Sequence, residues 1–217
     1  MVLTPSQARA FYDRFGSKQD TQAFYEDAAL DDLIAHAALD QANSVFEFGC
    51  GTGRFASRLL KECLPPSASY SGIDISQTMT ALASERLAPY AGRATVTLSD
   101  GSVSFPLADR SVDRVISTYV LDLLSVNDIC QAIHEAHRVL TTDGRLCLVS
   151  LTRGNGLASR IISSVWSALF RMHASLVGGC RPIRLDTFMD PQHWSVEYHH
   201  VVTQVGVPSE ILIARPA

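Results

Sequence analysis

The feature that most constrains the fold of this chain is a regular alternation of short apolar runs with helical stretches between residues 44 and 151. Strand–helix–strand repeats of this kind require parallel strands joined by right-handed crossovers, because each helix must return the chain to the same edge of the sheet. The pattern therefore predicts an α/β fold. The strands expected are 44–48, 68–73, 94–98, 112–117 and 145–151, and the helices between them are 54–63, 77–87 and 126–140.

The regions before and after this alternation predict further elements. Two helices are expected up to about residue 39, the first capped by Thr4 with Pro5 at its first position. Residues 157–177 are apolar on one face and end at Gly178-Gly179, which indicates a helix. The β-rich runs 194–204 and 209–214 are joined by only four residues, which favours an antiparallel hairpin. The sheet then has seven strands, five of them parallel, and is flanked by helices.

Composition narrows the classes of function. With 217 residues, 47% of them hydrophobic, the chain is long enough for one domain with a substantial core. The net charge of −4 and the absence of a Lys/Arg cluster argue against a nucleic-acid partner. The five cysteines form no CxxC pair, so no zinc site is expected and reduced thiols in the cytoplasm fit best. No run is long enough for stable membrane insertion, and the first residues do not have the pattern of a secretory signal.

The motif that carries the chemistry follows the first strand. Gly49, Gly51 and Gly53 alternate in a GxGxG turn that opens the first crossover helix, where the backbone turns sharply and approaches a ligand. The dinucleotide fingerprint is GxGxxG, so a pyrophosphate on the helix N-terminus is less expected here. Glu47 precedes the first glycine by two residues, in a place where a carboxylate meets a cationic group of a cofactor.

Residues 47–55, with Cys50 inside the glycine turn, resemble motif I of the class I S-adenosylmethionine (SAM)-dependent methyltransferases. The rest of the chain is similar to small bacterial members related to the ubiquinone/menaquinone-biosynthesis enzymes. The resemblance implies a Rossmann-like sheet, SAM as cofactor and S-adenosylhomocysteine (SAH) as product. It divides the single domain into a helical lid (1–40), a cofactor-binding core (41–151), a helical insertion over the substrate pocket (152–190) and a closing hairpin (191–217).

Further cofactor residues follow from the same resemblance. Asp74, about 20 residues beyond the glycines at the end of the second strand, would receive the ribose hydroxyls, as a ribose-reading carboxylate does. The remaining positions resemble those beside the ribose, the adenine or the methionine moiety, and they are Ile75, Met79, Asp100, Gly101, Thr118 and Tyr119. The glycines of motif I complete this set. No metal is expected, because methyl transfer needs mainly alignment and exclusion of water.

The acceptor pocket is expected outside the carboxyl ends of the strands, under the N-terminal helices and the insertion. The lid offers an aromatic and polar set, namely Tyr12, Phe15, Gln19, Asp20 and Tyr25, of which Tyr12 is the preferred lid residue. Asp122 is a candidate to orient or deprotonate the acceptor, and it equally fits a cap of the next helix. Tyr25, Trp166 and Arg181 are candidate substrate residues, although core packing explains Trp166 and a surface salt bridge explains Arg181 equally well.

Methylation of a small molecule is therefore the function expected, with its acceptor, the methylated atom and the oligomeric state left open by the sequence. Three alternatives remain. A nicotinamide-dependent oxidoreductase would use the same crevice, although the GxGxG spacing and the closing hairpin argue against it. A non-catalytic SAM-binding module would bind the cofactor without turnover. A lipid or quinone acceptor at a membrane surface would use the apolar segment 157–177.

Overall fold

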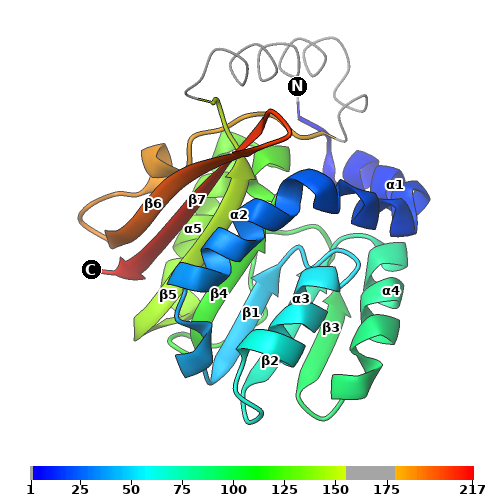
Figure 1. Ribbon diagram of the computed structural model, residues 1–217, viewed down its shortest axis with the longest axis horizontal. Helices are drawn as coiled ribbons and strands as arrows, with labels where there is room; N and C mark the ends of the chain where they lie inside the picture. The colour runs from blue at the N-terminus through cyan, green and yellow to red at the C-terminus, as the bar shows by residue number, and fades with distance from the viewer. Residues whose placement is uncertain (1, 155–178) are drawn as a thin grey trace.

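Seven strands form one mixed sheet in the computed structural model, which describes residues 2–154 and 179–217 (Figure 1). Their order across the sheet is β3-β2-β1-β4-β5-β7-β6, with β7 antiparallel to both of its neighbours and the other pairs parallel. The fold class predicted from the sequence is confirmed. The strands are β1 (Ser44–Phe48), β2 (Ser69–Asp74), β3 (Ala94–Leu98), β4 (Val112–Thr118), β5 (Leu140–Leu151), β6 (Trp194–Gln204) and β7 (Val207–Pro216).

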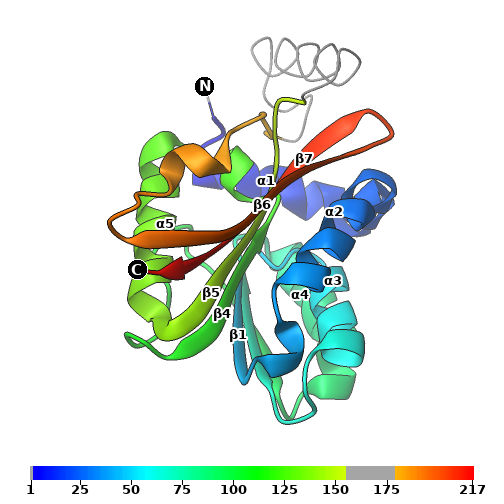
Figure 2. The same ribbon diagram turned by 60° about the vertical axis from the view of Figure 1, so that its left-hand side comes forward.

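Helices cover both faces of the sheet (Figures 1 and 2). One face carries α2, α3 and α4, and the other carries α5, while α1 lies across the carboxyl ends of the parallel strands. The α-helices are α1 (Pro5–Phe15), α2 (Ala23–His36), α3 (Arg54–Arg58), α4 (Gln77–Leu87) and α5 (Val126–Val139). Short 3-10 turns are η1 (Gly16–Gln22), η2 (Leu39–Gln41), η4 (Ala88–Tyr90), η5 (Leu121–Leu123) and η7 (Leu185–Phe188), and α3 continues as a π-helical turn, η3 (Leu59–Cys63).

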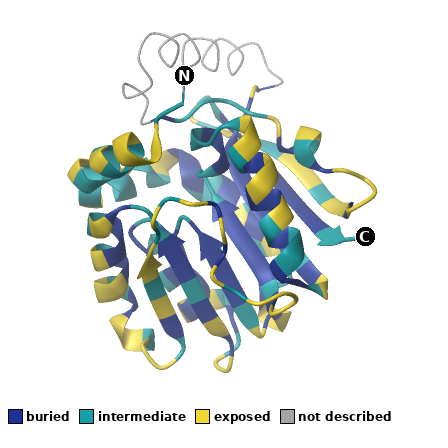
Figure 3. Cartoon of the chain, turned by 180° about the vertical axis from the view of Figure 1, so that it is seen from behind, coloured by how far each residue is buried: buried dark blue, intermediate teal, exposed yellow. Residues whose placement is uncertain are grey.

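Two hydrophobic layers hold these elements together. Successive strand residues point to opposite faces, so Val45 packs in the layer under α2 and α3, whereas Phe46 packs in the layer under α5. Because both faces of the central strands are covered, these strands read in the sequence as continuous apolar runs. In Figure 3 the central strands are buried, while much of α1 is exposed.

The N-terminal lid begins as the sequence predicts. Thr4 caps α1 in a capping box with Gln7, and Pro5 occupies the first turn. Gly16, with φ of 52°, ends α1 and allows the chain to turn into η1. The helix expected over 157–177 lies outside the described residues.

Two strands, β5 and β7, begin two or more residues before the predicted start. β5 begins at Leu140 rather than residue 145, because Leu140 already pairs with Val112 before the register shifts. The expected turn at residues 143–144 is thus an irregularity inside the strand. The hairpin turn consists of Val205 and Gly206 alone, both with positive φ, as two-residue hairpin turns require when the strands twist. β7 therefore begins two residues earlier than predicted.

The order of the strands reverses between β1 and β4, whose crossover connections leave in opposite directions. Ligands of open α/β sheets bind in the crevice that such a reversal opens at the carboxyl ends of the strands. In this chain, α1 and η1 cover that crevice. Among the residues that the structure describes, no helix is long and apolar enough to cross a membrane.

Candidate functional site

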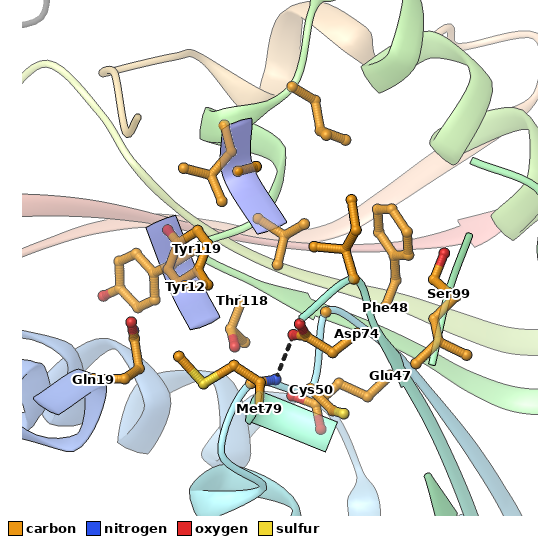
Figure 4. Close-up of a pocket in the computed structure, with 18 of the residues that line it drawn as sticks. Tyr12, Gln19, Glu47, Phe48, Cys50, Asp74, Met79, Ser99, Thr118 and Tyr119 are labelled. Carbon is orange, nitrogen blue, oxygen red and sulfur yellow. Dashed lines mark hydrogen bonds between the residues drawn. The ribbon is translucent and has the colours of Figure 1, made fainter. Parts of the chain in front are cut away.

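A pocket opens at the carboxyl ends of β1, β2 and β4 and is closed from above by the N-terminal helices (Figure 4). Every wall of it comes from a different part of the chain. The strand ends supply the floor, the glycine turn supplies one side, and α1, η1 and α2 supply the cover. The lining includes most of the residues predicted from the sequence, namely Tyr12, Glu47, Gly49, Cys50, Gly51, Asp74, Ile75, Met79, Gly101, Thr118 and Tyr119.

The glycine turn needs glycine for reasons that differ along it. Gly49 has φ of 81°, and a Cβ built there would lie 2.3 Å from Cγ2 of Val120. A Cβ on Gly53, with φ of 72°, would lie 3.0 Å from Cα of Ala83 in α4. Gly51, with φ of 53°, would meet nothing within 4 Å. Gly53 was predicted to bind the cofactor, but it lies outside the pocket lining. Its lack of a side chain instead allows α3 to approach α4.

Asp74 holds the turn from the end of β2. Its Oδ2 accepts a hydrogen bond from the Gly51 amide at 2.9 Å, the dashed line in Figure 4, and its Oδ1 accepts from the Ser76 amide at 2.8 Å. Burial raises its pKa, and these two amides oppose that shift. A carboxylate has about four acceptor positions, so both oxygens can still receive further donors from the pocket.

Glu47 is more deeply buried than its expected role requires. It is 1% exposed, and its Oε2 accepts a hydrogen bond from the Tyr70 hydroxyl at 2.5 Å. Burial raises its pKa to about 7, against the effect of the tyrosine hydrogen bond. Glu47 still contributes to the lining, but one of its two oxygens already accepts the Tyr70 hydrogen bond beneath the glycine turn.

The walls beyond Asp74 come from α4 and from the loop after β3. Met79 is 1% exposed and lies on the pocket wall, as Ile75, Ser99 and Gly101 do. Asp100 lies elsewhere than predicted. Its carboxylate caps the Ser102 amide at 2.8 Å, and it does not line the pocket. The Asp100 side chain therefore does not reach the place where the adenine was expected, because the loop turns this side chain outward.

The end of β4 carries a strained residue. Tyr119 has φ of 56°, a conformation that a residue with a Cβ seldom adopts outside functional sites. Its hydroxyl lies 2.8 Å from that of Ser209, and its amide donates to the Val149 carbonyl at 2.8 Å. These contacts keep the Tyr119 ring against the pocket beside Thr118 (Figure 4).

The lid is tied to the core by polar contacts. Arg9 donates to the carbonyls of Ile75 and Ser99 at 3.0 and 3.2 Å, and Asp13 accepts from the Ser76 hydroxyl at 2.6 Å. These bonds hold α1 on the ends of β2 and β3.

A second network holds η1. Asp20 accepts from the Arg86 guanidinium at 2.6 Å and from the Thr52 hydroxyl at 2.5 Å, and Arg86 also donates to the Thr52 carbonyl. The net effect lowers the pKa of Asp20, since these partners outweigh its burial. η1, α4 and the glycine turn thus share one ion-pair network.

Tyr12 lies on the lining from α1. Burial, followed by the nearby Cys180, raises the pKa of Tyr12 well above its ordinary value. The hydroxyl of Tyr12 is therefore protonated at neutral pH, and Tyr12 faces the pocket as a hydrogen-bonding group and not as a base.

Glu26 is a lining residue that the sequence did not single out. It comes from α2, is 7% exposed, and its Oε2 accepts from Nη2 of Arg54 at 3.2 Å. Burial raises its pKa to about 7, although Arg54 opposes the shift. Nη1 of Arg54 bonds Asp27 at 2.7 Å on the solvent side. No local sequence motif predicts the ion pair between Glu26 and Arg54, because the two residues come from different helices.

The residues predicted for the acceptor lie apart from the pocket lining where they are described. Asp122 is 0% exposed, its Oδ2 accepts from the Leu151 amide at 3.2 Å, and its Oδ1 has no hydrogen-bond partner among the described residues. Burial raises its pKa to about 7. Arg181 donates from its backbone and its guanidinium to the Asp122 carbonyl, both at 3.1 Å. Neither residue reaches the pocket, because η5 turns Asp122 into the core.

Tyr25 also lies outside the pocket lining. It is 6% exposed and packs edge-on against the Tyr119 ring at a centroid distance of 5.9 Å, so it supports a lining residue from behind. Trp166 is outside the described residues. In the part of the chain that is described, no cluster of histidine, cysteine and carboxylate side chains could hold a metal ion.

The charge of the lining is strongly asymmetric. Its described residues include one guanidinium, Arg54, which Glu26 and Asp27 already neutralise. Charged groups in a low-dielectric cleft attract ligands of the opposite sign. Of the acidic side chains, Asp20 and Glu26 are ion-paired with Arg86 and Arg54, whereas Glu47, Asp74 and Asp128 have no ion-pair partner among the described residues and favour a cationic ligand. The acidic residues of the lining are Asp20, Glu26, Glu47, Asp74 and Asp128.

Comparison with known proteins agrees with this site. A family model described as a methyltransferase domain matches residues 45–144, which include the glycine turn and β1 to β4. Malonyl-acyl-carrier-protein O-methyltransferase of Marinomonas sp. is 31% identical over 78% of this chain, and ubiquinone/menaquinone biosynthesis C-methyltransferase UbiE of Geobacter sulfurreducens is 29% identical over 64%. These alignments span 62% and 52% of the two relatives.

Solved structures show the same fold at low identity. The 4+2 cyclase SpnF matches with a TM-score of 0.74 and 17% identity, covering 99% of this chain and 97% of that one. N-methyltransferase NodS of Bradyrhizobium japonicum, solved with SAH, matches with a TM-score of 0.65 and 16% identity over 88% of this chain and 87% of its own. With the family match over the glycine turn and the strand order found here, the chain is similar to the class I SAM-dependent methyltransferases in the sequence around the glycine turn and in fold.

Proposed function

We propose that this protein transfers the methyl group of SAM to a small-molecule acceptor. The observation that carries the proposal is the pocket itself. A glycine turn, the Asp74 carboxylate and a lining whose charged side chains are mainly acidic converge at the point where the strand order reverses. SAM carries a sulfonium and an α-ammonium group, so a lining of carboxylates suits it electrostatically.

The same lining argues against the nicotinamide alternative. A pyrophosphate would bring two negative charges into a pocket whose described lining has five carboxyl groups and one arginine. Dinucleotide sites instead place the pyrophosphate on a helix N-terminus free of competing acids. A dinucleotide would therefore bind weakly here.

SAM, when bound, supplies an electrophilic methyl group on a positively charged sulfur. The residues of this chain then have three tasks. Asp74 and the glycine turn position the ribose, the side chains of Thr118 and Tyr119 lie beside the methionine moiety, and the lid with Tyr12 keeps water away from the methyl group. Asp122 remains a proposed base only if the pocket rearranges, since its carboxyl is buried outside the lining.

The acceptor is proposed only as a small molecule. The two curated relatives are named for different acceptors and different methylated atoms, one an oxygen and the other a carbon. The resemblance to SpnF, named as a cyclase, also shows that this fold carries more than one reaction. All five cysteines are free thiols, which supports a reducing compartment such as the cytoplasm.

Calorimetric titration with SAM, SAH and NADH in parallel tests the cofactor. We expect micromolar binding of SAM and SAH and none of NADH. Binding of NADH without SAM would overturn the proposal. Turnover is then tested with methyl-labelled SAM and an acceptor library of phenols, amines, quinones and carboxylates. SAM binding without label transfer to any member, or to metabolite extracts, would favour the non-catalytic binding module.

A further inference from the structure

The lid presents an unused acceptor to the pocket. Gln19, in η1, lines the pocket, and its Nε2 donates to the Gln22 side chain at 2.7 Å. That bond sets the direction of the amide and leaves its Oε1 buried without a hydrogen-bond partner among the described residues. Figure 4 shows the oxygen of Gln19 directed toward Tyr12 and Tyr119. A buried unpaired carbonyl costs about 1–3 kcal/mol, so its persistence indicates a donor that arrives with a ligand.

A paired acid and base stand on the same side of the pocket. Glu26 and Arg54 both line it, with 3.2 Å between Oε2 and Nη2. Glu26 follows Tyr25, whose ring touches that of Tyr119 at the end of β4, and Arg54 directly follows the glycine turn. Gln22, whose side chain holds that of Gln19, comes one helical turn before Glu26, so Gln19 and the Glu26–Arg54 pair lie on one side of the pocket.

Opposite charges side by side, with a neutral acceptor nearby, are complementary to an α-amino acid. Such a group carries an ammonium with three donors and a carboxylate that a guanidinium binds well. Glu26 Oε1 and Gln19 Oε1 are acceptors for the ammonium, and Arg54 is a donor to the carboxylate. Resting on the proposed use of SAM, we propose that Gln19, Glu26 and Arg54 form the subsite for its amino-acid end, in place of Glu47, whose carboxyl is buried against Tyr70.

The consequence is a division of labour in cofactor binding. The adenosine half is held by Asp74, the glycine turn and the ends of β2 and β3, whereas the amino-acid half is held by the lid and α3, beside the end of β4. The lid is then part of the cofactor site and not only a cover for the acceptor. The affinity of ligands that lack the amino-acid portion should not depend on Gln19 or Glu26.

Two ligands separate these halves without any acceptor. SAH has both halves, whereas 5′-methylthioadenosine keeps the adenosine and the thioether but lacks the amino acid. We expect Glu26→Gln and Gln19→Met each to weaken SAH binding about tenfold or more, as the loss of a charge-assisted or buried hydrogen bond does. Methylthioadenosine should bind both variants within twofold of the wild type. Calorimetry gives the four affinities, and the melting temperature reports folding.

Asp31→Asn is the matched control. Asp31 lies on α2 and pairs with Arg58 at 2.6 Å, as Glu26 pairs with Arg54, but it does not line the pocket. This variant should bind both ligands as the wild type does. An unchanged ratio of SAH to methylthioadenosine affinity in the Glu26 and Gln19 variants would overturn the subsite. This holds if both affinities stay at the wild-type level, and also if both fall equally, which indicates a structural defect.

A measurement on the unaltered protein covers the case in which the variants do not fold. The deamino analogue of SAH, which lacks only the α-ammonium, should bind the wild type at least tenfold more weakly than SAH. Equal affinities would overturn the subsite while leaving the proposed function intact. If the wild type binds neither SAH nor methylthioadenosine, the proposed function itself fails.

Discussion

The two sides of the pocket are built by different means. The floor, from the glycine turn to Asp74, is made by backbone conformation within a few residues of a strand end. The lid is made by side chains that reach across the molecule, such as Arg9 to the loop after β3 and Glu26 to α3. A floor of this kind is rigid because steric contacts and buried strands determine it. The lid depends on ion pairs and hydrogen bonds that solvent and pH can weaken.

This difference teaches which part of the site tolerates change. Altering one lid contact should leave the rest of the pocket in place, whereas altering the floor should disturb the fold. The exchangeable part of the site is therefore the lid, which is the part that we propose to meet the acceptor and the amino-acid end of the cofactor. Four predictions test this contrast, each on one side of the pocket.

Gly49→Ala should give the largest effect, a loss of roughly 4 kcal/mol in the free energy of unfolding. The new Cβ would lie 2.3 Å from Val120 Cγ2 at a φ of 81°, so strain and overpacking add together. Gly51→Ala is the control, with a cost of only about 1–2 kcal/mol, because its Cβ meets nothing within 4 Å. Urea denaturation of both variants measures this. Equal losses would show that steric contact does not determine the turn.

Glu47→Gln should change how stability depends on pH. The folded pKa of about 7 lies above the ordinary 4.5, so the protonated form is the one that the fold favours. Its contribution is full below about pH 4.5 and is lost as the pH rises through 7, which amounts to about 3 kcal/mol at 1.36 kcal/mol per pH unit. Between pH 5 and 8 the free energy of unfolding, measured by urea denaturation, should therefore fall less in the variant than in the wild type. Parallel curves for the two proteins would contradict the buried acid.

Asp74→Ala should weaken SAH and methylthioadenosine binding to the same extent, by about 1–3 kcal/mol, through lost hydrogen bonds to the ribose. This equal loss is the counterpart of the selective loss expected from Glu26→Gln. Calorimetry with both ligands measures it, and retained secondary structure is the control. If the variant weakened the binding of SAH alone, Asp74 would have to be assigned to the amino-acid end of the cofactor and not to the ribose.

Arg86→Ala should have the smallest effect, about 1 kcal/mol on stability, because its bonds to Asp20 and Thr52 are partly exposed. The informative readout is hydrogen exchange, which should accelerate in η1 and leave β1 unchanged. Arg58→Ala, which breaks a more exposed pair with Asp31, serves as the control and should leave η1 protected. Slow exchange in η1 of the Arg86 variant would mean that α1 alone holds the lid.

The comparison of prediction and structure follows the same division. Most of the strands and the glycine turn were predicted to within a few residues, because hydrophobic periodicity and glycine spacing are local signals. Asp74 and Thr118 line the pocket as expected, since each is the last residue of its strand, and Met79 lines it from the first turn of α4. Two of the predicted residues, Asp100 and Asp122, lie outside the pocket lining. Asp100 turns outward to cap Ser102, and Asp122 turns inward to the Leu151 amide, and neither direction is encoded in the neighbouring residues.

The sequence by itself determined the α/β sheet, the position of the cofactor crevice and the acids at its strand ends, because each depends on periodicity or spacing within about 30 residues. Only the tertiary structure decided that Glu26 meets Arg54, that Gln19 turns an unpaired oxygen into the pocket and that Gly53 serves helix packing. The physical reason is that these contacts join elements distant along the chain. Their geometry is set by how α2 and η1 pack on α3 and α4, and no local pattern records that packing.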